Sequence, residues 1–551
     1  MKTITYNIVL ILLASAFLFN CSEKNENSTV TIGIPSDIET TNPMYAFGMV
    51  DGSLSELLYL PLVKHAWNDK TGDLEPQLML AKKITWNSDF SELDVLLRDD
   101  VKWTDGKELT AEDVVFTFDV YSDPETESKF YGLFKNYYLL ENQKIDIKKS
   151  FEIISPYHLK IKFAPGSTPD LNNLDYPVLP EHIYSNIKRK DLAQKEKELP
   201  VVSNGPFKLK TWEKNQFVSL IANENSFLHN PENVNLIVFK VIPNISNRLI
   251  QLKKGEIDLV ENVRPDNLST VKSDSKLVIM PVRGRSYDYI GWNEVDPEEY
   301  SENNRTKPNR FFSSAKVRKA LTHAINREEI LNEFLYGYGE LAVGPVSPIF
   351  KKSVNPVLKP YSYDAELAIK LLREEGWADV DNDGILEKNN VEFSFALNYS
   401  PDKPHRKNAA VIIQNNLKAV GIRVNVVSLE KSVFLEKLFS KQFDAWLSGW
   451  TVPLPIELSQ FWHSSPEVGH LNLASYKNSE ADDILEKLQI RADDSYKYEL
   501  YKKFQEIIHR DEPFTFLFWA DNLVVYNSRI KNIDINPLGA IQKCWNWKID
   551  D

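Results

Sequence analysis

Hydrophobic and polar residues alternate most clearly in residues 92–118. Apolar residues at every second position predict a strand with one buried face: Leu93, Val95 and Leu97. A Thr-Asp-Gly turn follows at 104–106. Thr110 is a favourable N-cap, and Asp113 three residues later resembles the partner in a capping box. The segment therefore predicts a strand, a tight turn and a helix in that order.

Similar patterns predict alternating helices and strands further along the chain. Residues 314–325 carry apolar side chains at helical spacing on one face. A predicted helix at 406–420 ends at Gly421 and precedes a strand at 422–426, and further strands are predicted at 443–450, 513–520 and 523–526. A chain of 551 residues exceeds one hydrophobic core, so this alternation predicts an α/β protein with more than one lobe.

Several segments resemble one known family. LRDDVKWTDGKELTAEDVVFTF at 97–118 resembles the signature of the family 5 solute-binding proteins of ABC transporters, which carry peptides, nickel complexes or oligosaccharides. Three further segments resemble motifs of that family in the same order: SNGPFK at 203–208, IQLKKGEIDLV at 250–260 and VRKALTHAINREEI at 317–330. The resemblance covers residues 30–530.

The resemblance implies an α/β, two-lobed periplasmic-binding-protein fold of type II-like form, with an extra α+β subdomain inserted in the first lobe. We expect a signal peptide at 1–20 and a lipidated tether at 21–28. The first lobe is expected at 29–276 and 523–551, with its inserted subdomain at about 51–200. The second lobe is expected at 277–522, and ligand between the lobes.

The amino terminus predicts a lipid anchor. Residues 8–19 are almost wholly apolar and too short to span a bilayer, and Cys21 follows directly after Asn20. The segment resembles a lipoprotein cleavage site with Cys21 as the lipidated residue, although Gly or Ala is usual where Asn20 stands. The alternative is an uncleaved apolar anchor with an incidental cysteine. The expected location is the cell envelope, facing the periplasm or the exterior.

Composition and motifs narrow the classes of function. The net charge of −13 argues against nucleic acid as a partner. The sequence contains no GxSxG, HExxH or GxxxxGK[ST], so we expect no enzyme and no cofactor, although a glycosidase-like carboxylate pair is not excluded. Acidic residues Asp379, Asp381 and Asp383 resemble the start of a calcium loop. Asn390 stands where that loop needs a Glu, so we expect a bare acidic turn and no bound metal, with a calcium site as the alternative.

The candidate ligand residues are mostly aromatic or neutral: Tyr45, Asn204, Trp292, Asn293, Trp450, Thr451 and Glu457. In peptide-binding relatives an Asp follows the Gly-Trp pair within a few residues and holds the amino terminus of the peptide. Here residues 449–455 read GWTVPLP, and the first acid is Glu457. This difference predicts a ligand without a free amino terminus, unless Glu457 replaces the Asp. Core packing is the alternative role for Trp450.

The resemblance implies a monomeric substrate-binding lipoprotein of an ABC importer. It would capture a peptide or a similar small oligomeric solute and deliver it to membrane permease subunits. Two alternatives remain open: a sensor or chaperone-like lipoprotein without a dedicated permease, and a cryptic secreted hydrolase.

Overall fold

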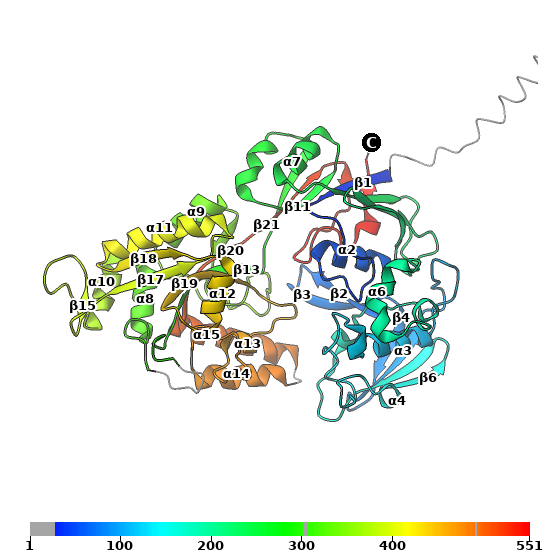
Figure 1. The fold of residues 1–551 in the computed structure, drawn as a ribbon, viewed down its shortest axis with the longest axis horizontal. Helices are drawn as coiled ribbons and strands as arrows, with labels where there is room; N and C mark the ends of the chain where they lie inside the picture. Colours follow the sequence, from blue (N-terminus) through cyan, green and yellow to red (C-terminus); the bar gives the residue numbers. More distant parts are fainter. Residues whose placement is uncertain (1–27, 301–306, 491–492, 551) are drawn as a thin grey trace, which may run out of the picture.

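The computed structural model describes residues 28–300, 307–490 and 493–550. Cys21 and the predicted signal peptide lie outside these ranges. Figure 1 shows two lobes side by side, joined by extended segments. Within the described ranges, no helix combines the length and the apolar character that a bilayer-spanning helix needs.

The first lobe is built on a seven-stranded sheet with the order β12-β21-β11-β1-β10-β9-β8. Its strands are β1 (Thr29–Ile34), β8 (Phe207–Glu213), β9 (Phe217–Ala222), β10 (Leu236–Val241), β11 (Leu259–Val263), β12 (Leu277–Val282) and β21 (Asn522–Asn527). Strand β1 runs parallel to β10 and β11, whereas β21 runs antiparallel to both β11 and β12. Helices α2 (Met49–Leu58) and α7 (Ile245–Lys254) belong to this lobe.

A smaller antiparallel sheet extends the first lobe, in the order β4-β5-β7-β6. It contains β4 (Ala81–Trp86), β5 (Glu92–Leu97), β6 (Phe151–Ser155) and β7 (His158–Lys162), with helix α3 (Ala111–Ser122) beside it. The predicted strand, turn and helix are confirmed, because α3 begins with a capping box in which the Thr110 N–H donates to Asp113 Oδ2 at 2.9 Å. Buried residues of β1 and β5 belong to the same apolar cluster, so the core of the first lobe and that of the inserted subdomain are continuous. The limits of the subdomain at about 51–200 therefore stay a prediction.

The second lobe has a six-stranded mixed sheet with the order β14-β20-β13-β19-β17-β18. Its strands are β13 (Ser286–Trp292), β14 (Gly339–Leu341), β17 (Ser394–Tyr399), β18 (Arg423–Ser428), β19 (Ala445–Thr451) and β20 (Phe514–Ala520). Its helices include α8 (Ala315–Ala324), α9 (Arg327–Leu335), α10 (Ala365–Glu374), α11 (Pro404–Ala419), α12 (Lys431–Phe439), α13 (Ser459–Trp462), α14 (Ser479–Gln489) and α15 (Asp494–Asp511).

The strand pairing moves one predicted boundary. Residues 277–282 were expected to open the second lobe, but they form β12 and pair with β21 in the sheet of the first lobe. The chain therefore crosses between the lobes at residues 283–285 and returns at Asp521, between β20 and β21. Hydrophobic pattern predicts that a strand exists here, but only the pairing shows which sheet it joins.

Candidate ligand-binding site between the lobes

The two sheets present the carboxyl ends of their parallel strands to each other. In the first lobe β1, β10, β11 and β12 run in one direction and end where the chain leaves for the second lobe. In the second lobe β13 begins at that crossover, and the antiparallel β19 ends beside it, together with β17 and β18. In open α/β sheets, ligands bind outside the carboxyl ends of such strands. The region between the lobes is therefore the candidate site.

The crossover segments lie against each other at Gly284. A Cβ added there would lie 2.1 Å from the Ala520 carbonyl oxygen, so the close approach requires glycine. The Ser347 hydroxyl donates to the Gly284 carbonyl at 2.8 Å, and the Val452 N–H donates to the Arg285 carbonyl at 2.9 Å. The crossover is thus held to the second-lobe segment that follows β19.

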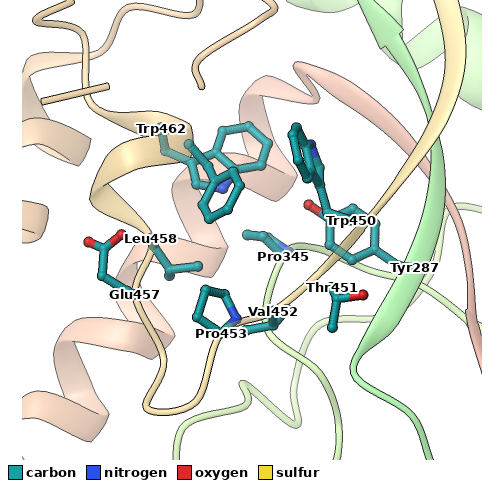
Figure 2. A pocket seen from close by; sticks show the side chains of 10 residues that line it. Tyr287, Pro345, Trp450, Thr451, Val452, Pro453, Glu457, Leu458 and Trp462 are labelled. Carbon is teal, nitrogen blue, oxygen red and sulfur yellow. The ribbon is translucent and has the colours of Figure 1, made fainter. Parts of the chain in front are cut away.

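Three predicted ligand residues meet at the end of β19. Trp450, Thr451 and Glu457 line one pocket together with aromatic and proline side chains (Figure 2). The Trp450 ring packs edge-on against Phe461 with centroids 5.1 Å apart, and Thr451 Oγ1 lies 2.7 Å from Ser286 Oγ. The enclosed space is about 10 Å³, roughly that of a single water molecule. In this structure Trp450 is a half-buried wall of the pocket.

Glu457 is already engaged by the protein. Its carboxylate accepts from the backbone N–H of Ser459 at 2.8 Å, from that of Gln460 at 3.3 Å and from Gln489 Nε2 at 3.3 Å. Figure 2 shows this carboxylate directed away from Trp450. Glu457 therefore serves the start of α13 in this structure, rather than a ligand beside Trp450.

The other predicted ligand residues are separated from this pocket. Trp292 and Asn293 have no exposed surface, which corrects the prediction that they face the ligand. The Trp292 indole N–H donates to Thr515 Oγ1 at 3.1 Å, and the Asn293 amide donates to the Phe443 carbonyl at 3.1 Å. Alternation along β13 could not show this, because both faces of that central strand are covered.

Two candidates lie in the first lobe. Asn204 is buried and its Oδ1 accepts from the Leu60 N–H at 2.7 Å, so it holds the backbone together. Tyr45 is half-buried in the loop after β1, and its hydroxyl donates to the Thr126 carbonyl at 2.9 Å. Burial raises the pKa of Tyr45, so its hydroxyl stays protonated. Tyr45 is only partly buried and remains a predicted ligand residue.

A charged cluster at the second-lobe edge was missed by the sequence analysis. Asp288 on β13 accepts from Arg406 Nε at 3.0 Å and Nη2 at 2.9 Å, and its Oδ2 lies 2.8 Å from His405 Nε2. Burial alone would raise the pKa of Asp288, but the charge of Arg406 and these hydrogen bonds hold that pKa well below its usual range. A lone Asp inside the apolar strand 286–292 was the available signal.

This cluster explains the glycine before Trp450. A Cβ on Gly449 would lie 2.3 Å from Asp288 Oδ1 and 2.8 Å from Arg406 Nη2. The Gly-Trp pair therefore combines a residue that leaves room for a buried ion pair with one that lines the pocket.

The candidate calcium loop lies on the surface of the second lobe. Carboxylate oxygens of Asp379, Asp381 and Glu387 lie within 4.8 Å of one another. Asp383 is outside this group: its Oδ1 accepts from the Ile385 N–H at 2.8 Å, and its Oδ2 lies 3.7 Å from Arg423. A calcium site stays the alternative to the predicted bare acidic turn, and Glu387 rather than Asp383 completes the group of three carboxylates.

Comparison with known proteins shows which class of protein this chain belongs to. The family model described as bacterial extracellular solute-binding proteins, family 5 Middle, matches residues 75–467. The chain belongs to this family of extracellular solute-binding proteins. It is similar to the oligopeptide-binding protein AppA of Bacillus subtilis (strain 168), with 30% identity over 571 residues that cover 99% of each chain.

Solved structures agree with the fold. The structure of AppA from Bacillus subtilis in complex with a nonapeptide matches with a TM-score of 0.67 and 29% identity, covering 95% of this chain and 99% of that one. NikZ from Campylobacter jejuni in complex with Ni(L-His) matches with a TM-score of 0.68 and 25% identity, covering 95% of this chain and 100% of that one. The predicted two-lobed fold is confirmed.

Proposed function

We propose that this protein captures a peptide, or a similar small oligomeric solute, between its lobes and delivers it to the permease of an ABC importer. The observation that carries the proposal is the meeting of strand carboxyl ends across the crossover, with Trp450 and Thr451 at the second-lobe edge. The similarity to an oligopeptide-binding protein over the whole chain supports a peptide as the solute. In this proposal the solute binds the closed form of the protein more tightly than the open form, and this difference in affinity drives closure without any catalytic step.

Native mass spectrometry of freshly purified protein tests this function directly. A co-purified peptide or glycan that leaves on mild denaturation is the expected result. A chain with no bound solute that also fails to bind a mixed peptide library would contradict the proposal.

Closure of the lobes should be visible in solution. Ligand contacts to both lobes should favour the closed form, so X-ray scattering should show a smaller radius of gyration with the recovered solute than without it. The value should fall toward the roughly 24 Å expected for a compact chain of this length. An identical scattering profile at saturating solute would argue against hinge closure.

We further propose that the lipid on Cys21 anchors the protein in the cell envelope, on the periplasmic or outer face. One acyl chain gives only marginal membrane binding, whereas several give stable anchoring. Cys21→Ser should therefore move the protein from the membrane fraction to the soluble fraction. A matched Ser22→Ala variant should stay in the membrane fraction, and membrane retention of Cys21→Ser would contradict lipidation as the anchor.

A further inference from the structure

A hairpin of the first lobe reaches the second lobe. Strands β2 (Val63–Asn68) and β3 (Asp73–Leu78) pair in register, and we call residues 67–73 the hairpin tip. Trp67 is only 8% exposed and belongs to an apolar cluster whose other buried members, such as Tyr287 and Phe516, come from the second lobe. Its ring meets Phe350 edge-on with centroids 5.9 Å apart. Trp67 and Gly72 of the tip are therefore buried against the second lobe, whereas Asp69 and Lys70 stay exposed.

Polar contacts and close backbone packing hold the hairpin tip in place. Lys351 Nζ donates to the Asp69 carbonyl, and the Tyr498 hydroxyl of α15 donates to Asp73 Oδ2 at 3.0 Å. Gly72 has a φ of +63°, and a Cβ there would lie 2.2 Å from the Ile349 carbonyl oxygen and 2.5 Å from the Lys351 nitrogen. The backbone of the tip thus lies directly against residues 349–351.

This contact is separate from the crossovers. A cavity of about 380 Å³ lies between them. It is lined by the end of β12 and Arg283 of the first crossover, by Trp67 and Asp69 of the hairpin, by second-lobe residues 348, 349 and 351, and by residues 535–537 of the first lobe. The same second-lobe segment touches both points, because Ser347 donates to the Gly284 carbonyl while Phe350 contacts Trp67. That segment also carries Pro345, which lines the pocket at Trp450.

We propose that the hairpin tip is a third connection between the lobes, and that it restricts their closing motion to one rotation axis. Two lobes joined only where the crossovers touch, at Gly284 and Ala520, can bend and twist about any axis through that point. A second fixed point leaves only the axis through both points. The lobes then meet in one orientation, which lowers the ordering cost of binding a ligand that contacts both lobes.

Distances between spin labels on the two lobes test this connection in the ligand-free protein. In a Cys21→Ser background, labels on cysteines introduced at Lys208 of β8 and Glu366 of α10 lie on exposed positions of different lobes, and the remaining native cysteine, Cys544, is buried. Gly72→Ala should push the tip off residues 349–351 and broaden the label-to-label distance distribution at least twofold. Gly166→Ala is the matched control, because Gly166 has a φ of +76° but a Cβ there meets no atom within 4 Å.

A second variant removes the polar contacts of the hairpin tip by changing residues of the second lobe. Lys351→Met combined with Tyr498→Phe leaves the hairpin sequence intact and should also broaden the distribution. Near-ultraviolet circular dichroism confirms that each variant is folded. Unchanged widths in both Gly72→Ala and the double variant would overturn the proposal. Since no ligand is added, this result does not depend on whether the protein binds peptides.

Discussion

Pentapeptides with an acetylated amino terminus are expected to bind roughly 100- to 10,000-fold more tightly than the same peptides with a free amino terminus. The sequence after Trp450 reads Thr-Val-Pro-Leu-Pro, without an acid. Glu457 already accepts from two backbone N–H groups that begin α13. An ammonium group enclosed beside Trp450 would therefore be unpaired, and breaking a buried charge pair costs about 3–5 kcal/mol.

Isothermal titration calorimetry with matched acetylated and free peptides measures this difference in affinity. Pro453→Asp provides the informative control, since Pro453 lines the pocket with Trp450 and an aspartate there restores an acid. That variant should gain affinity for the free peptides. Submicromolar binding of free peptides that disappears on acetylation would overturn the prediction, and its loss in Glu457→Gln would identify Glu457 as the partner.

Asp288→Asn is expected to lower the free energy of unfolding by about 3–5 kcal/mol, because it deprives the buried Arg406 of the carboxylate that accepts two of its hydrogen bonds. The side chains of Asp288 and Arg406 are 13% and 10% exposed, and they share two hydrogen bonds. Urea denaturation at pH 7 measures the difference. Glu392→Gln is the control: its partner Arg423 lies 2.6 Å away on the surface, with both side chains nearly half exposed, so a loss of about 0–1 kcal/mol is expected.

The contribution of Asp288 to the free energy of unfolding should decrease in acid. The folded-state pKa of Asp288 lies below the unfolded value of about 3.9, so its stabilising contribution is complete above that value and declines as the pH falls through the folded-state pKa. The difference between Asp288→Asn and the wild type should therefore shrink in strong acid, as the pH falls from about 3.9 through the folded-state pKa of Asp288. A destabilisation below about 1 kcal/mol at pH 7 would show that the ion pair does not stabilise the lobe.

The sequence by itself determined those helices and strands that depend on residues only a few positions apart. The strand and capped helix of residues 92–122 follow from alternation and from Thr110 and Asp113, which lie three positions apart. Helix α11 ends at Ala419, two residues before Gly421, whose φ of +84° interrupts helical geometry. The family motifs also lie within continuous segments, so the class and the two-lobed fold could be predicted.

Tertiary structure alone decided which of the candidate ligand residues are buried in the core. Trp292 and Asn293 became core residues because both faces of β13 are covered. The Asp288 cluster joins residues 117 and 118 positions apart, and the contact between Tyr498 and Asp73 joins residues 425 positions apart. Strand β12 joined the first sheet because of its pairing with β21, which follows more than 200 residues later. Such contacts depend on sheet order and on the placement of one lobe against the other, and periodicity within a segment carries no information about either.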